Sequence, residues 1–427
     1  MSLFDLLAGL IGISAIFSYI NYRFLKLPMA IGLMVIGLLF SLVIVVMGLY
    51  DPAIHDQAQA ILLQVDFDEA LMQGMLGFLL FAGALHVDIN DLREQRGLIL
   101  TLAVLGTLLT TILVGGVLYL VLPLLGVELS LWYCLLFGSL IAPTDPIAVL
   151  SILKKLGVPK SLEVQITGES LFNDGVGVVV FLAILSLAGI GGGHADISGG
   201  AIAWLFVQEA LGGALFGLAI GLLGYWTLKS IDSYQVEILI SLALVFTGYA
   251  IALWLHISGP IAMVIAGLLL GNHGRAFAMS RTTREHLDMF WELVDEFLNA
   301  ILFVLIGLEM LILSFLGEYL FAGAIVIVIV LLARLGTVAL PINFLRWRGK
   351  GENLPRYTSR LMTWGGLRGG ISVALALSIP ATLSGEPVAE REVVVSLTYI
   401  VVVFSIVVQG LTIGPLLRRW EIVSPNS

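Results

Sequence analysis

The chain has 427 residues, of which 59% are hydrophobic and 12% are charged, and its formal net charge is −9. Its mean hydropathy of +1.05 excludes an ordinary soluble protein and indicates an integral membrane protein. The acidic balance argues against a nucleic-acid partner, and the single cysteine, Cys134, excludes a disulfide within the chain.

Apolar runs of about 20 residues predict transmembrane helices rather than the short alternating strands of a membrane barrel. Thirteen runs are centred near residues 13, 38, 78, 110, 141, 175, 214, 246, 265, 306, 329, 370 and 404. The first has no Lys or Arg before it and is followed by Arg23 and Lys26. We therefore expect a retained first span with the N-terminus outside, rather than a cleaved signal peptide.

The charged breaks between the runs alternate in sign. Basic residues follow every odd-numbered span: Arg23, Lys26, Arg93, Arg96, Lys154, Lys155, Lys160, Lys229, Arg275, Arg281, Arg284, Arg346, Arg348, Lys350, Arg356, Arg418 and Arg419. The even-numbered breaks carry Asp51, Asp56, Asp66, Asp68, Glu69, Glu128, Asp196, Glu318, Glu386, Glu390 and Glu392, with Arg391 as their one basic residue. This alternation predicts a C-terminus in the cytoplasm.

The fifth span is interrupted by Ala142-Pro143-Thr144-Asp145-Pro146. Each proline removes a backbone donor and disfavours helix in the residue before it. A plain kink would explain the prolines but would need no acid. Asp145 suits the positive N-terminal end of a half-helix, so the sequence predicts a discontinuous helix here.

The sixth span carries Glu169, Ser170, Asn173 and Asp174 within an apolar segment. Ser170 and Asp174 lie four residues apart and share one helix face, with Asn173 beside them and Glu169 under Asn173. A carboxylate near the membrane centre costs at least about 2.5 kcal/mol, so such residues usually serve ions or protons. The alternative is a hydrogen-bonded network that only packs helices together.

Three later spans add further features. Gly213, Gly217 and Gly221 in the seventh predict close packing against a neighbouring helix. Arg334, inside the eleventh, needs a carboxylate partner, and Glu169 is our choice. The twelfth has four glycines around Arg368, which favours an unwound segment whose arginine suits the negative C-terminal ends of half-helices.

Taken together, the spans predict an all-α polytopic membrane protein with 13 transmembrane helices. Residues 1–188 form a first six-helix repeat, 200–230 a linking seventh helix, and 234–420 a second repeat. Because a single helix separates the two repeats, the second repeat enters the membrane from the opposite face. The discontinuous helices 5 and 12 are then the fifth helix of each repeat. Such an arrangement is typical of transporters.

Four segments resemble the monovalent cation:proton antiporter family, most closely its NhaP-type sodium/proton antiporters, which are related to the animal sodium/proton exchangers. These segments are Thr144-Asp145-Pro146, residues 168–175, residues 303–309 and Gly366-Leu367-Arg368-Gly369. The resemblance covers nearly the whole chain. It implies a homodimer in which a core of helices 4–6 and 11–13 moves against an interface domain of helices 1–3 and 7–10.

The resemblance also implies roles for individual residues. The ion-binding aspartate falls on Asp174, and the residues that match its supporting ligands and structural partners are Asp145, Ser170, Thr144, Asn173, Glu169, Arg334 and Arg368. Of these, Asn173 matches the asparagine beside the ion-binding aspartate, and Glu169 and Arg334 match a structural ion pair. Arg368 matches the arginine whose charge compensates the helix ends at the crossing.

We therefore expect a transporter of the cell (inner) membrane, not an enzyme, which exchanges Na⁺ (or Li⁺ or K⁺) for H⁺ and serves pH homeostasis. Cation and proton would compete for Asp174 with alternating access, and Asn173 in place of a second acid predicts electroneutral 1:1 exchange. We expect membrane lipids as partners and no cofactor beyond the transported ions. A cation channel, or less favourably an intramembrane hydrolase, is the alternative, although no HExxH motif occurs.

Overall fold

The computed structural model describes residues 3–62, 64, 67, 70–190, 199–311, 316–347, 357–383 and 386–420. Seven residues of the alternating charge pattern lie outside these ranges: Asp66, Asp68, Glu69, Asp196, Arg348, Lys350 and Arg356.

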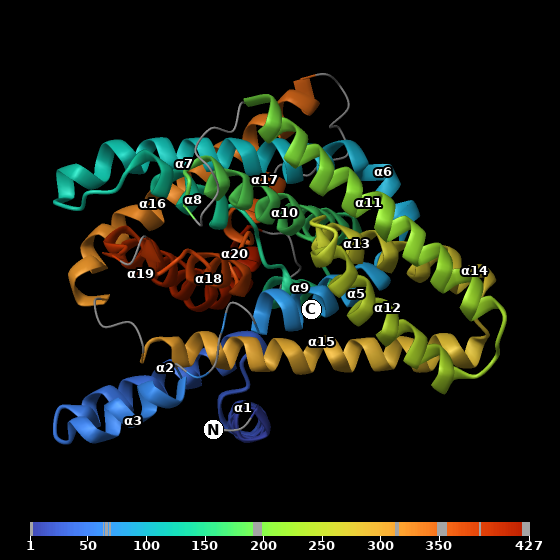
Figure 1. The fold of residues 1–427 in the computed structure, drawn as a ribbon, viewed down its shortest axis with the longest axis horizontal. Helices are drawn as coiled ribbons and strands as arrows, with labels where there is room; N and C mark the ends of the chain where they lie inside the picture. The colour runs from blue at the N-terminus through green and yellow to red at the C-terminus, as the bar shows by residue number, and fades with distance from the viewer. Residues whose placement is uncertain are drawn as a thin grey trace.

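The described chain is almost entirely helical (Figure 1). Its first half contains α1 (Leu3–Ile20), η1 (Asn21–Leu25), α2 (Met29–Gly48), α3 (Pro52–Leu62), η2 (Ala70–Met75), α5 (Leu76–Leu85), α6 (Ile89–Leu100), η3 (Thr101–Gly106), α7 (Thr107–Val121), η4 (Leu122–Leu125), α8 (Leu131–Leu140), α9 (Ile147–Leu156) and α10 (Lys160–Leu187).

The second half contains α11 (Gly199–Lys229), α12 (Tyr234–Trp254), α13 (Gly259–Leu269), η5 (Leu270–Gly274), α14 (Arg275–Phe277), α15 (Arg281–Glu309), α16 (Leu316–Trp347), α17 (Thr358–Trp364), α18 (Gly370–Leu377), β1 (Thr382–Leu383), β2 (Glu386–Pro387), α19 (Ala389–Val403), η6 (Phe404–Gln409) and α20 (Gly410–Arg419). The two short strands pair antiparallel.

A helix, or the junction between two helices, lies at each of the thirteen predicted span positions. Within the described ranges, eight helices are long and apolar enough to cross a membrane. The all-helical membrane fold is therefore confirmed, whereas the count of thirteen crossings and the inverted repeat stay predictions.

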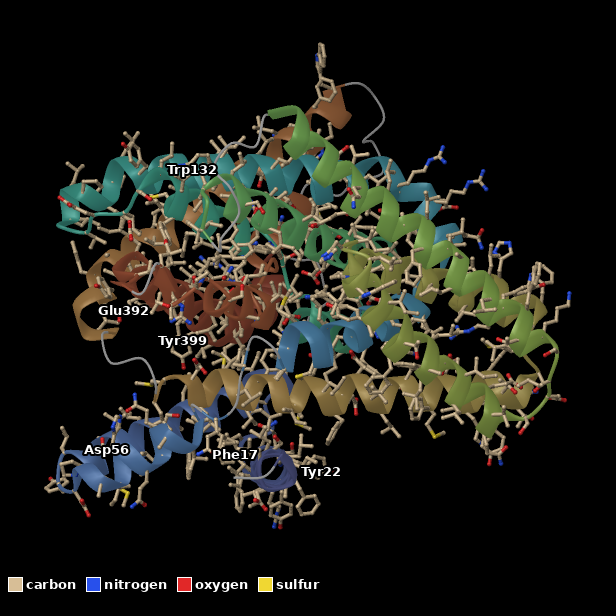
Figure 2. The ribbon with its side chains drawn as sticks, in the orientation of Figure 1. Phe17, Tyr22, Asp56, Trp132, Glu392 and Tyr399 are labelled. Carbon is tan, nitrogen blue, oxygen red and sulfur yellow. The ribbon has the colours of Figure 1, made fainter. Side chains whose placement is uncertain are left out.

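One helix was not expected from the sequence. The helix α3 occupies the break between the second and third predicted spans, where it packs against α2. Most of its residues are exposed, and Asp56 lies on it at the edge of the molecule (Figure 2). A search for long apolar runs does not find this helix, because many of its residues are polar. Pro52 at its first position is nevertheless favourable for starting a helix.

Polar side chains and glycines mark several helix ends. The carboxylate of Asp88 accepts a hydrogen bond from the backbone N–H of Asn90 at the start of α6, over 2.8 Å. Ser280 accepts one from the N–H of Thr283 at the start of α15, over 3.3 Å. Gly157 ends α9 with φ +65°, a conformation that glycine adopts without strain.

Both predicted interruptions are present. The helix α8 ends at Leu140 and α9 begins at Ile147, while α17 ends at Trp364 and α18 begins at Gly370. The residues between them are the proline-containing and glycine-containing segments singled out in the sequence. Because a half-helix end leaves unpaired backbone groups, each break needs partners from elsewhere in the fold.

Arg391, the basic residue in an otherwise acidic set of breaks, serves such a helix end. Its Nε donates to the carbonyl of Ile379 over 2.6 Å, and its Nη2 donates to the carbonyl of Leu377 over 2.9 Å. The guanidinium therefore caps the C-terminal end of α18, where a positive charge is favoured. This contact explains the one departure from the charge alternation.

Helices approach closely where glycines lie in the contact. A side chain at Gly213 would meet Ser258, and one at Gly217 would meet Ala262, so α11 packs tightly on α13 as the glycine spacing predicts. A second close approach joins Gly37 of α2 to Gly307 of α15. There the hydroxyl of Ser41 donates to the carbonyl of Gly307 over 2.9 Å.

The helix α10 lies inside the bundle and contacts α6, α8 and α18, whereas α15 runs along one side of the bundle against α2 and α5 (Figure 1). The periphery is apolar. On the N-terminal helix, Phe17 is buried against Phe40 with ring centroids 5.6 Å apart, while Tyr22 points away from the molecule (Figure 2). Exposed aromatic and aliphatic side chains are expected where a protein faces lipid.

Candidate ion-binding site

The two interrupted helices cross at their breaks. The backbone N–H of Asp145 donates to the carbonyl of Leu367 over 2.8 Å, and these residues form an isolated antiparallel bridge. Residues 222 positions apart in the sequence, 145 and 367, thus satisfy each other's backbone groups at this point. The crossing brings four half-helix ends to one place.

Arg368 caps one of those ends. Its Nη1 donates to the carbonyls of Ala142, over 2.5 Å, and Pro143, over 2.9 Å, which follow the C-terminal end of α8. Its side chain is buried, with 2% of the residue exposed. A cation at the negative end of a helix dipole is stabilised, and the sequence prediction for Arg368 agrees with this contact.

The segment η6, which joins α19 to α20, supplies further partners for the same crossing. The hydroxyl of Ser405 accepts a hydrogen bond from the backbone N–H of Arg368 over 2.9 Å and donates one to the side chain of Gln409 over 2.7 Å. The amide of Gln409 in turn donates to the carbonyl of Trp364, at the end of α17, over 2.9 Å. Neither Ser405 nor Gln409 was expected at the site from the sequence.

Asp145 lies at the N-terminal end of α9, as its position after the break predicts. Its Oδ1 accepts a hydrogen bond from the backbone N–H of Ile147 over 2.9 Å. Gly369 of the other break lies against its carboxylate, so that a Cβ at position 369 would collide with Asp145. Glycine is therefore needed there for close approach rather than for an unusual backbone angle.

The sixth predicted span contacts the first break through two polar side chains. The hydroxyl of Ser170 donates to the carbonyl of Thr144. Asn173 pairs with Thr144 in both directions: its Nδ2 donates to Thr144 Oγ1 over 2.9 Å, and its Oδ1 accepts from the Thr144 backbone N–H over 3.3 Å. These bonds hold α10 against the break and orient the oxygens of Thr144.

A cavity of about 170 Å³ lies next to this contact. Its polar lining includes the four residues predicted to hold the ion, namely Thr144, Asp145, Ser170 and Asp174, together with Ser372, Asp295 and Asn299. Asp174 is 9% exposed, and its neighbours along the cavity are mostly apolar side chains. The structure thus brings three carboxylates and several neutral oxygens around one small buried space.

Glu169 and Arg334 form the ion pair expected from the sequence. Arg334 Nη1 lies 2.5 Å from Glu169 Oε1, and Nη2 lies 2.9 Å from Oε2, so the contact is bidentate. Nη2 also donates to the carbonyl of Met362 over 3.3 Å. Both residues are buried, and neither lines the cavity. The pair therefore joins α10, α16 and α17 beside the cavity rather than within it.

Asp295 and Asn299 also line the cavity, from α15, and neither was expected from the sequence. They lie four residues apart, the same spacing that drew attention to Ser170 and Asp174. This four-residue spacing of polar side chains is the feature of the sequence that points to a site on α15. The many charged residues before Asp295 obscure it, because they make the segment resemble a solvent-exposed helix.

Comparisons with known proteins agree on one family. The sequence profile of the family described as "Sodium/hydrogen exchanger, transmembrane" matches residues 12–419. The chain is 51% identical over 419 residues to the Na(+)/H(+) antiporter NhaP of Pseudomonas aeruginosa, covering 97% of this chain and 96% of that protein. It is 36% identical over 402 residues to the Na(+)/H(+) antiporter NhaH of Halobacillus dabanensis, covering 93% of each.

A solved structure shares the fold. The sodium proton antiporter MjNhaP1 from Methanocaldococcus jannaschii superposes with a TM-score of 0.74 at 22% sequence identity, over 98% of this chain and 99% of that one.

The buried ion pair makes a stability prediction. Glu169→Gln leaves the Arg334 guanidinium without its counter-charge, which typically costs about 3–5 kcal/mol for a buried pair. We expect a clear fall in the melting temperature of the detergent-purified protein, measured by intrinsic fluorescence. The double variant Glu169→Gln with Arg334→Met removes both charges and should recover much of the loss. The matched control is Glu163→Gln, in the first turn of the same helix; a fall no larger than that of the control would contradict the structural role.

Proposed function

The chain belongs to the family of sodium/hydrogen exchangers, and on that premise we propose that it is a secondary active antiporter exchanging Na⁺, or Li⁺ or K⁺, for H⁺. The observation that carries the proposal is the meeting of Thr144, Asp145, Ser170 and Asp174 around one small cavity inside an apolar bundle. Oxygen atoms of these kinds suit hard cations. The channel and hydrolase alternatives gain no support from matches to antiporters.

Asp174 is the proposed exchange residue. It lies in the middle of α10, where an ionised carboxylate is costly unless a cation or a proton neutralises it. Two neutralising partners that need the same oxygens exclude each other. If the site crosses the membrane barrier only when neutralised, occupancy by either partner but not both produces exchange.

The neighbouring residues are proposed as ligands and as supports. The hydroxyl hydrogen of Ser170 is directed to the Thr144 carbonyl, so the lone pairs of its oxygen remain for a cation. Asp145 adds a second carboxylate, fixed by the backbone N–H of Ile147. Asn173 and Arg368 maintain the break and its crossing without entering the exchange.

We infer that alternating access comes from movement of a core against an interface domain. The core consists of spans four to six and eleven to thirteen (α6 to α10 and α16 to α20), and every proposed ligand belongs to it. The facing wall of the cavity comes from α5 and α15 of the interface domain. A homodimer in the inner membrane, with the N-terminus outside and the C-terminus in the cytoplasm, completes the proposal.

The site assignment predicts the effect of Asp174→Asn. The amide cannot exchange a proton at neutral pH, so we expect Na⁺-driven proton movement in proteoliposomes to fall to the level of empty liposomes. The melting temperature should stay near that of the unaltered protein. Asp56→Asn, on the exposed α3, is the matched control and should keep full exchange. Near-normal exchange by well-folded Asp174→Asn would rule out the assignment.

The stoichiometry makes a second prediction. Asn173 is neutral and is paired with Thr144, so position 173 offers no second proton-binding group. We expect one proton per cation and no net charge movement. With the membrane voltage of proteoliposomes clamped at several values and the ion gradients fixed, the rate and direction of exchange should not change. A rate or direction set by the voltage would refute electroneutral exchange.

A further inference from the structure

Asp295 and Asn299 occupy one face of α15 and stand opposite the helices that carry the proposed exchange site. Both line the cavity that contains Asp145 and Asp174, and Asp295 is near enough to Asp145 for the two carboxylates to interact electrostatically. The proposed exchange cycle assigns neither residue a role. A third carboxylate at this cavity strengthens the negative potential that attracts cations.

Three cavities follow one another through this region. The first, of about 170 Å³, contains Asp174 and shares Ile147, Asp295 and Asn299 with a second of about 410 Å³. The second shares Met29 and Ser151 with a third of about 680 Å³.

The third cavity lies at the basic side of the molecule. Arg23, Lys26 and Lys155 line it, and by the charge alternation these residues mark the cytoplasmic side. Asp295 and Asn299 therefore stand at the boundary between the exchange cavity and the cavities that lead toward the basic side.

Asn299 gives an independent sign that this boundary binds something. The residue is 6% exposed, its Oδ1 has no hydrogen bond to any residue that the structure describes, and its Nδ2 meets only the Asp295 carboxylate, without the geometry of a full hydrogen bond. A buried amide whose oxygen has no partner is costly, because that oxygen has given up its hydrogen bonds to water. Its carbonyl oxygen is the kind of neutral ligand that a dehydrating cation accepts, and a carboxylate lies one helical turn away.

We propose that Asp295 and Asn299 form a second binding site for the transported monovalent cation, on the cytoplasmic side of Asp174. This inference rests on the proposed exchange function and deepens it. The cation exchanges part of its hydration shell for the Asp295 carboxylate and the Asn299 carbonyl before it reaches Asp174 and Asp145. We refer to Asp295 and Asn299 as the α15 site.

Because Asp295 and Asn299 belong to α15, their effect on cation affinity depends on the conformational state of the transporter. Asp174 and Asp145 belong to the proposed core, whereas α15 belongs to the proposed interface domain. When the core moves, the distance between the two sets of carboxylates changes. The α15 site therefore raises cation affinity in the state described here and not in the opposite one, so the two faces of the membrane differ in apparent affinity.

The test uses the full chain in everted membrane vesicles, which expose the cytoplasmic face, and in right-side-out vesicles. Proton flux is measured as Na⁺ is varied. We expect Asp295→Asn to raise the apparent KM for Na⁺ about tenfold in everted vesicles, the size of effect that loss of one charge near a partly buried ion produces. The maximal rate should change much less, and the KM in right-side-out vesicles should stay the same.

Three further variants separate binding from structure. Asp295→Glu keeps the charge and should restore a low KM, while Asn299→Leu keeps the branched shape but removes the oxygen and should raise the KM. The matched control is Glu292→Gln, an exposed acid on the same helix, which should leave the KM unchanged. Melting temperatures of all variants establish that they are folded.

The outcomes separate this inference from the exchange function. Normal exchange by the unaltered protein with the same KM in Asp295→Asn or Asn299→Leu overturns the α15 site alone. An equal rise in Glu292→Gln, or equal rises at both membrane faces, also overturns it, because the effect would then be one of surface charge. Absence of Na⁺-dependent proton flux in the unaltered protein overturns the exchange function and the α15 site together.

Discussion

The backbone groups freed by two broken helices are the constraint on which the rest of the structure depends. In a membrane each unsatisfied group costs several kcal/mol, so neither break could exist alone. Here the breaks satisfy each other through Asp145 and Leu367, while Arg368 and Gln409 cap the C-terminal ends of α8 and α17. The result is a small buried space beside carboxylate and hydroxyl oxygens, which unbroken helices would not provide.

Different residues of α10 serve the stability of the fold and the proposed ion exchange. Glu169 pairs with Arg334 away from the cavity, while Asp174 lines the cavity and Ser170 and Asn173 hold the Thr144 break in place. Because Glu169 and Arg334 satisfy each other, the other buried acid of the helix, Asp174, is free of that arginine. The exchange proposed for Asp174 depends on this separation, since a guanidinium next to its carboxylate would compete with both cation and proton.

Much of this arrangement can be predicted from the sequence, because several of its features would destabilise a membrane helix unless other residues compensated them. Proline and glycine clusters predict both breaks, an arginine within an apolar span requires an acid, and Glu169 is that acid. Other features depend on how distant segments meet. The crossing of the breaks and the roles of Ser405 and Gln409 follow from tertiary contacts, and α3 is too polar to be found as an apolar run. Asp295 and Asn299 gain their meaning from the cavity that they line.

The central claim is that one carboxylate serves cation and proton in turn, and proton release on cation binding tests it most directly. Na⁺ would be added to the detergent-solubilised protein in weakly buffered solution, near the pH at which the site is half protonated. A pH dye would record the protons released, and calorimetry would record the Na⁺ bound. The account predicts that Na⁺ binding displaces protons, that acidification weakens Na⁺ binding, and that Asp174→Asn shows no release. Na⁺ binding to the unaltered protein with no proton release, and with equal affinity at every pH, would contradict it.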